Sequence, residues 1–99
     1  MKHPSLDLDE ETVAEAAATL AAAGDALRFH LLVELARGPR TVSELAARVA
    51  RAPTAVSKAL GVLRRGGLVQ ARRRGQYVHY SWSATHVGAI VSAAVALTR

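Results

Sequence analysis

The fold is decided by residues 53–82, PTAVSKALGVLRRGGLVQARRRGQYVHYSW, because the spacing of apolar residues changes within this stretch. Pro53–Arg65 carries apolar residues every three to four positions after an opening proline, as in an amphipathic helix. The glycine pair that follows ends this helix. The next residues alternate with a period of two, which predicts strands over Leu68–Arg72 and Gln76–Trp82 joined by a turn at Arg73–Gly75. The stretch therefore predicts a helix followed by a β-hairpin.

Further helices flank this stretch on both sides. Thr41-Val42-Ser43-Glu44 matches a capping box, in which the threonine caps a helix and the glutamate three residues later reaches back to it. The predicted helices cover about Asp9–Ala23, Asp25–Ala36 and Thr41–Val49, and a last one is capped by Ser83 or Thr85 and reaches Leu97. The order α-α-α-α-β-β-α predicts a mostly α-helical fold with a β-hairpin wing, a winged helix-turn-helix. We expect a flexible N-terminal arm over residues 1–8 and a single domain over residues 9–99.

Charge is divided unevenly along the chain. All eight acidic residues lie between Asp7 and Glu44, whereas residues 45–99 carry nine of the 13 basic residues. A segment with many cations and no anion attracts polyanions, so the pattern predicts a nucleic-acid partner. The alternative, an ordinary solvated basic face, usually mixes both signs of charge.

The helix-turn-helix and the wing supply the predicted DNA contacts. In such a motif the second helix enters the major groove, and here Val56, Leu60 and Leu63 face the core while the opposite face is polar. The arginines at the hairpin turn are expected to contact phosphates or to enter a minor groove. The candidate DNA-binding residues are Arg51, Thr54, Ser57, Lys58, Arg72, Arg73, Arg74 and Gln76, with Arg48 as a further phosphate contact. The alternative for Thr54 and Ser57 is that they only cap or solvate the helix.

The composition also predicts a subunit interface. A chain of 99 residues has a small core, yet 51% of its residues are hydrophobic. The last helix is apolar on nearly every face, so a monomer would expose a large apolar patch there. We therefore expect a two-fold homodimer through the first and last helices, with Val13, Ala17, Leu20, Val87, Ile90, Val91, Ala94 and Leu97 in the interface. The alternative is that the last helix only completes a monomer core.

Residues 27–83, LRFHLLVELARGPRTVSELAARVARAPTAVSKALGVLRRGGLVQARRRGQYVHYSWS, resemble the ArsR-type (arsenic-repressor-like) transcriptional regulators, and the resemblance covers about residues 10–98. Its most telling pieces are SELA (43–46), AVSKALGVLRRGGLV (55–69) and RRRGQYVHYS (72–81). The resemblance implies a winged-helix homodimer that binds an imperfect inverted repeat in double-stranded DNA and is released when an effector weakens that binding. It also implies base readout by Thr54, Ala55, Ser57 and Lys58.

The chain departs from the metal-sensing members of that family. It has no cysteine, whereas members that sense arsenic, cadmium or lead carry cysteines near the start of the third helix. His86 stands at a histidine position of the zinc, cobalt and nickel sensors, but Ala84 and Leu97 replace two further ligands. Because such sites need three or four ligands, His86 is only a weak metal candidate, to which His3 of the N-terminal arm, with Asp7 or Asp9, would add ligands. We predict no cofactor.

A sequence-specific repressor is the preferred functional hypothesis, and three alternatives stay open. They are an architectural DNA-binding protein without an operator, a metal-responsive repressor with an atypical site that includes His86, and a winged helix that binds only proteins. The chain has no glycine-rich phosphate loop, no clustered carboxylate pair and no metal-ligand set, so we do not expect an enzyme. It has no signal peptide and no apolar run of about 20 residues, so we expect a cytoplasmic protein without a membrane partner. We expect repression because the chain has no room for a separate activation domain.

Overall fold

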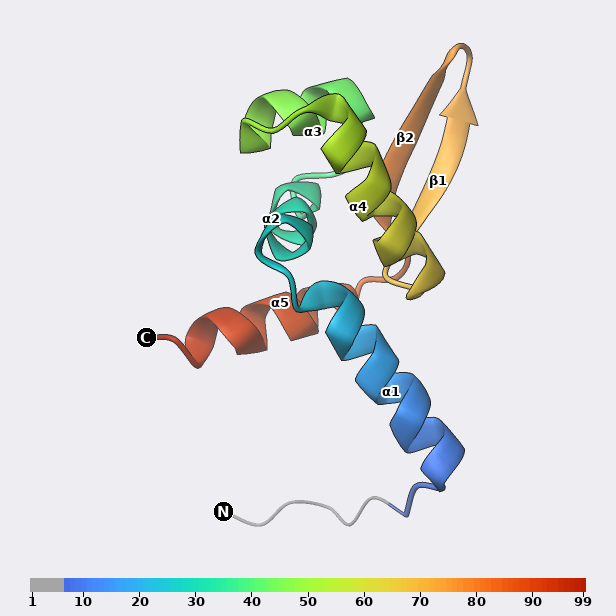
Figure 1. Cartoon of the computed structure of the whole chain (residues 1–99), viewed down its shortest axis with the longest axis vertical. Coiled ribbons are helices and arrows are strands. Elements are labelled where there is room, and N and C mark those ends of the chain that lie inside the picture. Colours follow the sequence, from blue (N-terminus) through green and yellow to red (C-terminus); the bar gives the residue numbers. More distant parts are fainter. Residues whose placement is uncertain (1–6) are drawn as a thin grey trace.

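The computed structural model describes residues 7–99, and its elements follow the predicted order (Figure 1). They are α1 (Glu10–Ala23), α2 (Ala26–Leu35), α3 (Val42–Val49), α4 (Pro53–Arg65), β1 (Val69–Arg74), β2 (Tyr77–Trp82) and α5 (Val87–Ala96). The predicted winged helix-turn-helix is confirmed, since α3 and α4 are followed directly by the β1–β2 hairpin. Most of the predicted N-terminal arm, residues 1–6, lies outside the described residues, and Asp7 and Leu8 are exposed before α1 begins.

Side chains begin three of the helices where the sequence predicts them. The carboxylates of Asp9 and Asp25 accept hydrogen bonds from the backbone amides three residues later, at 2.7 and 3.0 Å. The predicted capping box is present: the hydroxyl of Thr41 accepts from the amide of Glu44 at 3.2 Å, and the Glu44 carboxylate accepts from the amide of Thr41 at 2.8 Å. Hydrogen bonding from the side chain of Thr12, and next from its backbone amide, holds the pKa of the Asp9 carboxyl below its usual value. The bond from the backbone amide of Thr41 lowers the pKa of the Glu44 carboxyl in the same way.

The start of α5 differs from the prediction. Neither Ser83 nor Thr85 caps this helix, because α5 begins only after His86 and no side chain bonds to its first turn. The hydroxyl of Ser83 instead donates to the carbonyl of Gly67 at 2.6 Å, which ties the end of the hairpin to the loop after α4. Serine and threonine also make such bonds in turns, so their presence before an apolar run does not by itself locate the cap.

The core lies where α2, α3, α4 and the base of the hairpin meet. Its fully buried side chains are Leu31, Leu32, Leu45, Val56, Leu60, Leu63 and Leu68. Burying one such side chain contributes about 1.5–3 kcal/mol, and no polar or charged residue among residues 7–99 is buried with them. This apolar packing fixes α4 against α2 and α3, so the outer face of α4 has a defined direction.

The strands of the hairpin differ from the predicted ones. Arg73 and Arg74 belong to β1, together with Arg72, rather than to the turn, and Arg74 pairs with Tyr77. The turn is Gly75-Gln76, and Gly75 has a φ of +64°, as a two-residue type II′ turn requires of its first central position. The sequence pattern suggested a shorter strand because arginine is not a typical strand residue, but pairing with the strongly β-forming β2 overrides that preference.

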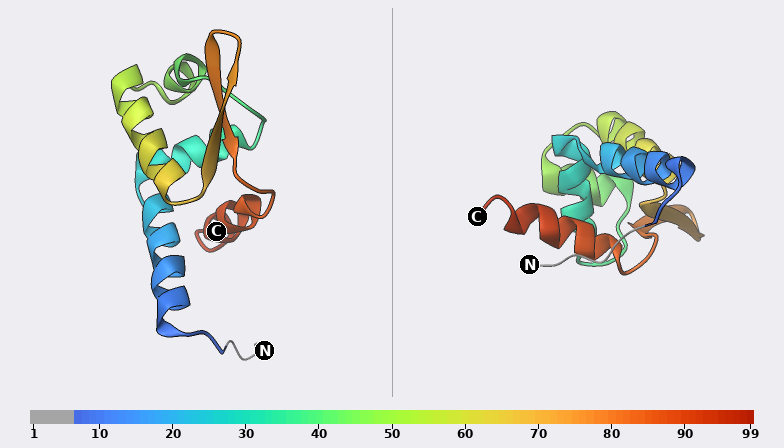
Figure 2. Two further views of the ribbon diagram at one scale, coloured as in Figure 1. Left: turned by 90° about the vertical axis from the view of Figure 1, so that its right-hand side faces the viewer. Right: turned by 90° about the horizontal axis from the view of Figure 1, so that it is seen from below.

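Helices α1 and α5 project from the body of the protein (Figures 1 and 2). Every residue from 7 to 18 is exposed, and the radius of gyration is 14.7 Å, compared with about 13 Å for a compact domain of this length. The fold thus leaves two helices with little to pack against. No single helix within residues 7–99 has both the length and the apolar character needed to cross a membrane.

Candidate nucleic-acid interface

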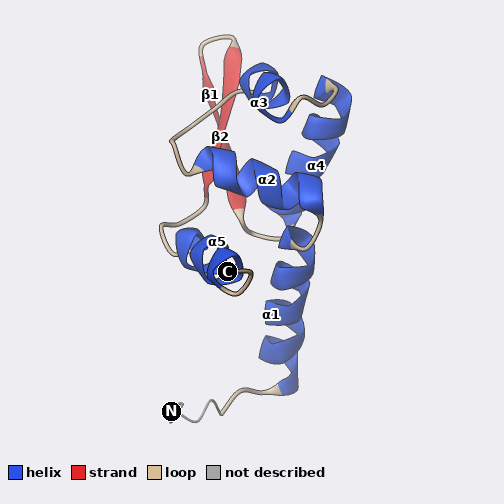
Figure 3. Cartoon of the chain, turned by 90° about the vertical axis from the view of Figure 1, so that its left-hand side faces the viewer, coloured by secondary structure: helices blue, strands red, loops and turns tan. Residues whose placement is uncertain are grey.

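A tight turn sets α4 against α3. Ala50 ends α3 in the left-handed conformation, with a φ of 55°, and the amide of Arg51 donates to the carbonyl of Ala46 at 3.2 Å. Pro53 then opens α4 at a position where no amide hydrogen is needed. Figure 3 shows the first turns of α4 at the same end of the molecule as α3 and the hairpin turn. This is the arrangement in which a recognition helix reaches a major groove.

The buried and exposed faces of α4 are those that the sequence predicts. Val56, Leu60 and Leu63 are fully buried, and the predicted DNA-contact residues Thr54, Ser57 and Lys58 are exposed, as is Arg51 in the preceding turn. Ala52 is the N-cap of α4, and no side chain caps the helix. Thr54 and Ser57 therefore do not cap this helix, whereas the alternative that they only solvate it is not tested by this arrangement. Both hydroxyls are placed where they can donate to or accept from base edges.

Ala55 is less accessible than its neighbours. It is half-buried, and with Arg51 and Lys58 it lines a hollow of about 350 Å³ beside the first turn of α2. Alanine has only a methyl group as its side chain, which limits its role in base readout to an apolar contact such as that with a thymine methyl.

The wing carries three arginines that no carboxylate neutralises. Arg72, Arg73 and Arg74 are exposed and take part in none of the ion pairs found among residues 7–99. Side chains alternate between the two faces of a strand, so Arg72 and Arg74 lie on one face of the hairpin and Arg73 on the other. With Gln76 exposed in the turn, the end of the wing presents positive charge on both faces.

Arg48, which we expect to contact a phosphate, also pairs with an acidic residue of its own protomer. Its guanidinium donates to the carboxylate of Glu34 at 3.0 Å, which links α3 to α2. This hydrogen bond lowers the pKa of the Glu34 carboxyl. The side chain of Glu34 is only 12% exposed, whereas that of Arg48 is 53% exposed, so the phosphate contact by Arg48 stays a prediction.

Two features of the wing were not predicted. Arg40 forms an isolated antiparallel bridge with Tyr80, through hydrogen bonds of 3.0 and 2.8 Å, and so adds a minimal third strand beside β2. A single bridge has no sequence signal, since one residue cannot show a period.

Tyr77, next to the turn, is 56% exposed. The alternation of β2 could have identified it as an outward-facing aromatic ring near the DNA-contact arginines.

The residues predicted for the dimer interface fall into three groups. Val13, Leu20 and Leu97 are 52%, 59% and 87% exposed, and Ala17 is exposed as well. Ile90, Val91 and Ala94 of α5 are half-buried. Val87 is only 3% exposed. Its assignment to the interface needs correction, because the protomer's own core already covers this side chain.

His86 lies exposed immediately before α5. Within residues 7–99, no three side chains of histidine, cysteine, aspartate or glutamate come together in a way that could hold a metal ion. His3, the other candidate, lies outside the described residues. Of the other ligands considered for the metal-responsive alternative, Asp7 and Asp9 lie within the described residues and form no such group with His86.

Known proteins share this geometry. The family model described as bacterial regulatory protein, arsR family, matches residues 25–71, from the N-cap of α2 into β1. The chain is 38% identical to the HTH-type transcriptional regulator NmtR of Mycobacterium tuberculosis over 92 residues. These aligned residues are 93% of this chain and 77% of NmtR. The chain belongs to the ArsR family.

Two further proteins resemble this chain. The transcriptional activator HlyU of Vibrio cholerae is 35% identical over 82 residues, which are 83% of this chain and 76% of that protein. The homodimeric winged helix-turn-helix DNA-binding domain of Mb0332 from Mycobacterium bovis, a possible ArsR-family regulator, has a TM-score of 0.85 at 26% identity, over 98% of this chain and 90% of that chain. As a member of the ArsR family, the protein is a DNA-binding transcriptional regulator and not an enzyme.

Proposed function

We propose that this ArsR-family protein is a homodimeric, sequence-specific repressor that acts in the cytoplasm and leaves its operator when an effector binds. One observation supports this most strongly. The basic surface of α4 and the wing lies at one end of the long axis, and the projecting α1 lies at the other (Figure 1). Two copies can therefore join through α1 and α5 without covering either DNA-binding surface.

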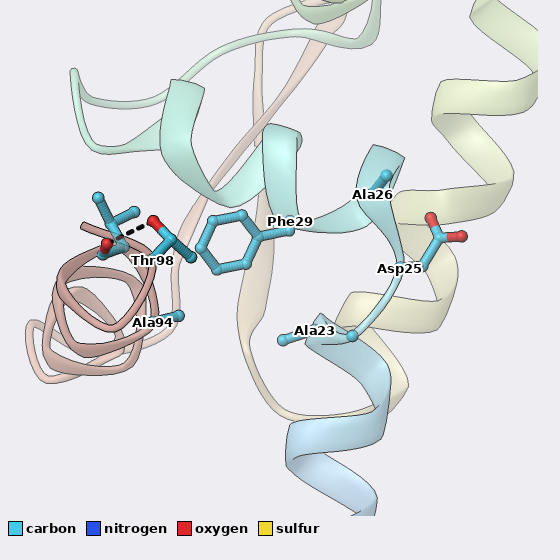
Figure 4. Close-up of a pocket in the computed structure, with 8 residues that line it drawn as sticks. Ala23, Asp25, Ala26, Phe29, Ala94 and Thr98 are labelled. Carbon is cyan, nitrogen blue, oxygen red and sulfur yellow. Dashed lines mark hydrogen bonds between the residues drawn. The ribbon is translucent and has the colours of Figure 1, made fainter.

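The apolar surface left open on the protomer fits a second copy of the chain. A groove of about 430 Å³ between α1 and α5 is almost free of polar atoms and is lined by Leu20, Ala89, Ile90, Ala93, Ala94 and Leu97. A further hollow of about 440 Å³ separates Phe29 of α2 from the second half of α5 (Figure 4). Helix α5 is thus packed mainly at its start, and the rest of it would expose apolar surface unless a partner covered it. The apolar stripe of α1, with Val13 and Ala17, supplies the complementary surface.

Two-fold symmetry determines the kind of DNA sequence that such a dimer recognises. Each protomer presents the same face of α4, so the two halves of the operator must be inverted copies of each other. Recognition helices that enter successive major grooves on one face of the duplex are about 34 Å apart. An imperfect inverted repeat in double-stranded DNA meets both conditions.

The distribution of charge along the molecule favours DNA binding through the wing and α4. The arm and α1 carry Asp7, Asp9, Glu10, Glu11 and Glu15, whereas the opposite end carries the arginines of the wing. Such a separation orients an approaching polyanion toward α4 and the wing.

Repression follows from occupancy of the promoter, because a dimer bound there blocks the polymerase. An activator is the second candidate, supported by the likeness to HlyU, whose name describes it as an activator.

DNA binding is expected to weaken steeply with salt. If each protomer neutralises about four phosphates, the dimer engages about eight, and the slope of log K against log salt is about −7. Fluorescence anisotropy with a labelled duplex between about 50 and 300 mM salt measures this slope. A nearly flat salt dependence would contradict electrostatic docking by the wing.

Sequence specificity separates a repressor from an architectural DNA-binding protein. We expect the dimer to bind the promoter region of its own gene about 10³-fold or more tightly than bulk genomic DNA. A competition assay at fixed salt, with unlabelled bulk DNA against the labelled promoter fragment, gives this ratio. Equal competition would favour the architectural alternative.

A further inference from the structure

Trp82 connects the base of the wing to the helical core. It is the last residue of β2 and the only tryptophan in the sequence. Its indole Nε1–H donates to the carbonyl oxygen of Leu32 in α2 at 2.9 Å. The side chain therefore bridges the DNA-binding hairpin and the helix at the centre of the core.

The carbonyl that Trp82 binds lies near the C-terminal end of α2. The last four carbonyls of a helix lack partners from the helix itself, and the amide of Ala36 bonds to Val33 at 3.1 Å rather than to Leu32. The indole thus satisfies a carbonyl that α2 leaves open. Because this partner comes from β2, the bond fixes the hairpin relative to α2 as well as completing the helix end.

The other edge of the indole ring lies against the first turn of α5. A Cβ atom placed on Gly88 would lie 2.9 Å from Cζ3 and 3.1 Å from Cη2 of Trp82. Only glycine allows the ring to approach the α5 backbone this closely, since the ring is rigid and cannot bend aside. The indole is consequently held between α2 and α5.

A small rotation at this point moves the DNA-contact residues by a large distance. Trp82 pairs with Val69 at the base of the hairpin, and Arg74 pairs with Tyr77 at its end. Five residue steps along a strand span about 17 Å, so a rotation of about 10° at the base shifts the arginines by about 3 Å. Such a shift is enough to break direct hydrogen bonds to phosphates.

We propose that Trp82 is a positioning residue for DNA binding, which sets the direction of the wing relative to α4, and that Gly88 keeps the space that the indole needs. This inference rests on the proposed function, in which the wing arginines contact DNA. If Trp82 has this role, the direction of the wing also depends on how α5 packs against the indole ring. Helix α5 is the helix that we assign to the dimer interface.

The test is a double-mutant cycle between the indole site and the wing arginines. Trp82→Phe removes the hydrogen-bond donor and keeps an aromatic ring, and Gly88→Ala displaces the ring while improving the helix propensity of α5. We expect each change to weaken operator binding about fivefold in the parent protein, and less than about twofold when Arg73 and Arg74 are alanine, because contacting or coupled sites are not additive. Ser92→Ala, one turn further along α5 and exposed, is the control and is expected to have no effect.

Two further measurements make the outcome decisive. Urea unfolding shows that each variant is folded, and the emission of the single tryptophan is expected to shift in Gly88→Ala but not in Ser92→Ala. Unchanged operator affinity in both variants, or an equal loss with and without the wing arginines, would overturn the positioning role. Failure of the proposed function would look different, because the parent protein itself would then not bind duplex DNA.

Discussion

Replacing Arg73 and Arg74 together by alanine is expected to weaken operator binding by about 10²- to 10³-fold at 0.15 M salt. Both side chains are exposed and have no acidic partner among the ion pairs of residues 7–99. The dimer thus loses four cations that are free to contact phosphates. Each phosphate contact contributes about 0.9 to the salt slope, so the slope is expected to become shallower by about 3 to 4.

Anisotropy titrations at several salt concentrations measure both the affinity and the slope of this double variant. Arg99→Ala is the control, because it also removes an arginine but lies at the C-terminal end, away from the wing and α4 (Figure 1). It should leave the salt slope nearly unchanged. A double variant that binds the operator as tightly as the parent does would contradict the phosphate contacts assigned to Arg73 and Arg74, and a parent protein that does not bind duplex DNA would support the alternative of a winged helix that binds only proteins.

Most of the helical fold and the recognition helix could be predicted, because their signals are local. Pro53, the capping box at Thr41 and the apolar spacing of Val56, Leu60 and Leu63 each act within a few residues of chain. The structure places all of them as the sequence predicts. The outer face of α4 followed from the same spacing, since a helix with one buried stripe has only one opposite face.

What the sequence could not predict depends on tertiary contacts. The salt bridge of Arg48 with Glu34 could not be predicted, because that requires knowing that α2 and α3 meet at that point. Val87 has the same apolar character as the α5 residues around it, and only the packing of α5 against the core decides that its side chain is covered. The hydrogen bond from Trp82 to Leu32 joins residues 50 positions apart. No spacing rule along the chain links such residues.

Replacing Leu20 by glutamate is expected to give a monomer and to weaken operator binding by about 10³-fold. Leu20 lines the groove between α1 and α5 and is 59% exposed in the protomer, so the carboxylate can stay hydrated in the monomer and the fold should be retained. In the proposed dimer each carboxylate would be buried, and burying one unpaired ion costs several kcal/mol. A monomer binds only one half-site of the operator at a time. Linking two binding modules raises affinity by about 10²- to 10⁴-fold, and this gain is lost when the protomers separate.

Light scattering and anisotropy on the same preparation separate the two effects of this substitution. Ala18→Glu is the matched control, since it adds the same charge to α1 at an exposed position about 160° around the helix from Leu20. It should remain dimeric and bind DNA normally. A Leu20→Glu protein that stays dimeric would place the interface on another surface, whereas a monomer with full operator affinity would remove the need for two-fold symmetry in recognition. Loss of both properties in Leu20→Glu alone would link the apolar surface of α1 and α5 to DNA binding at the far end of the molecule.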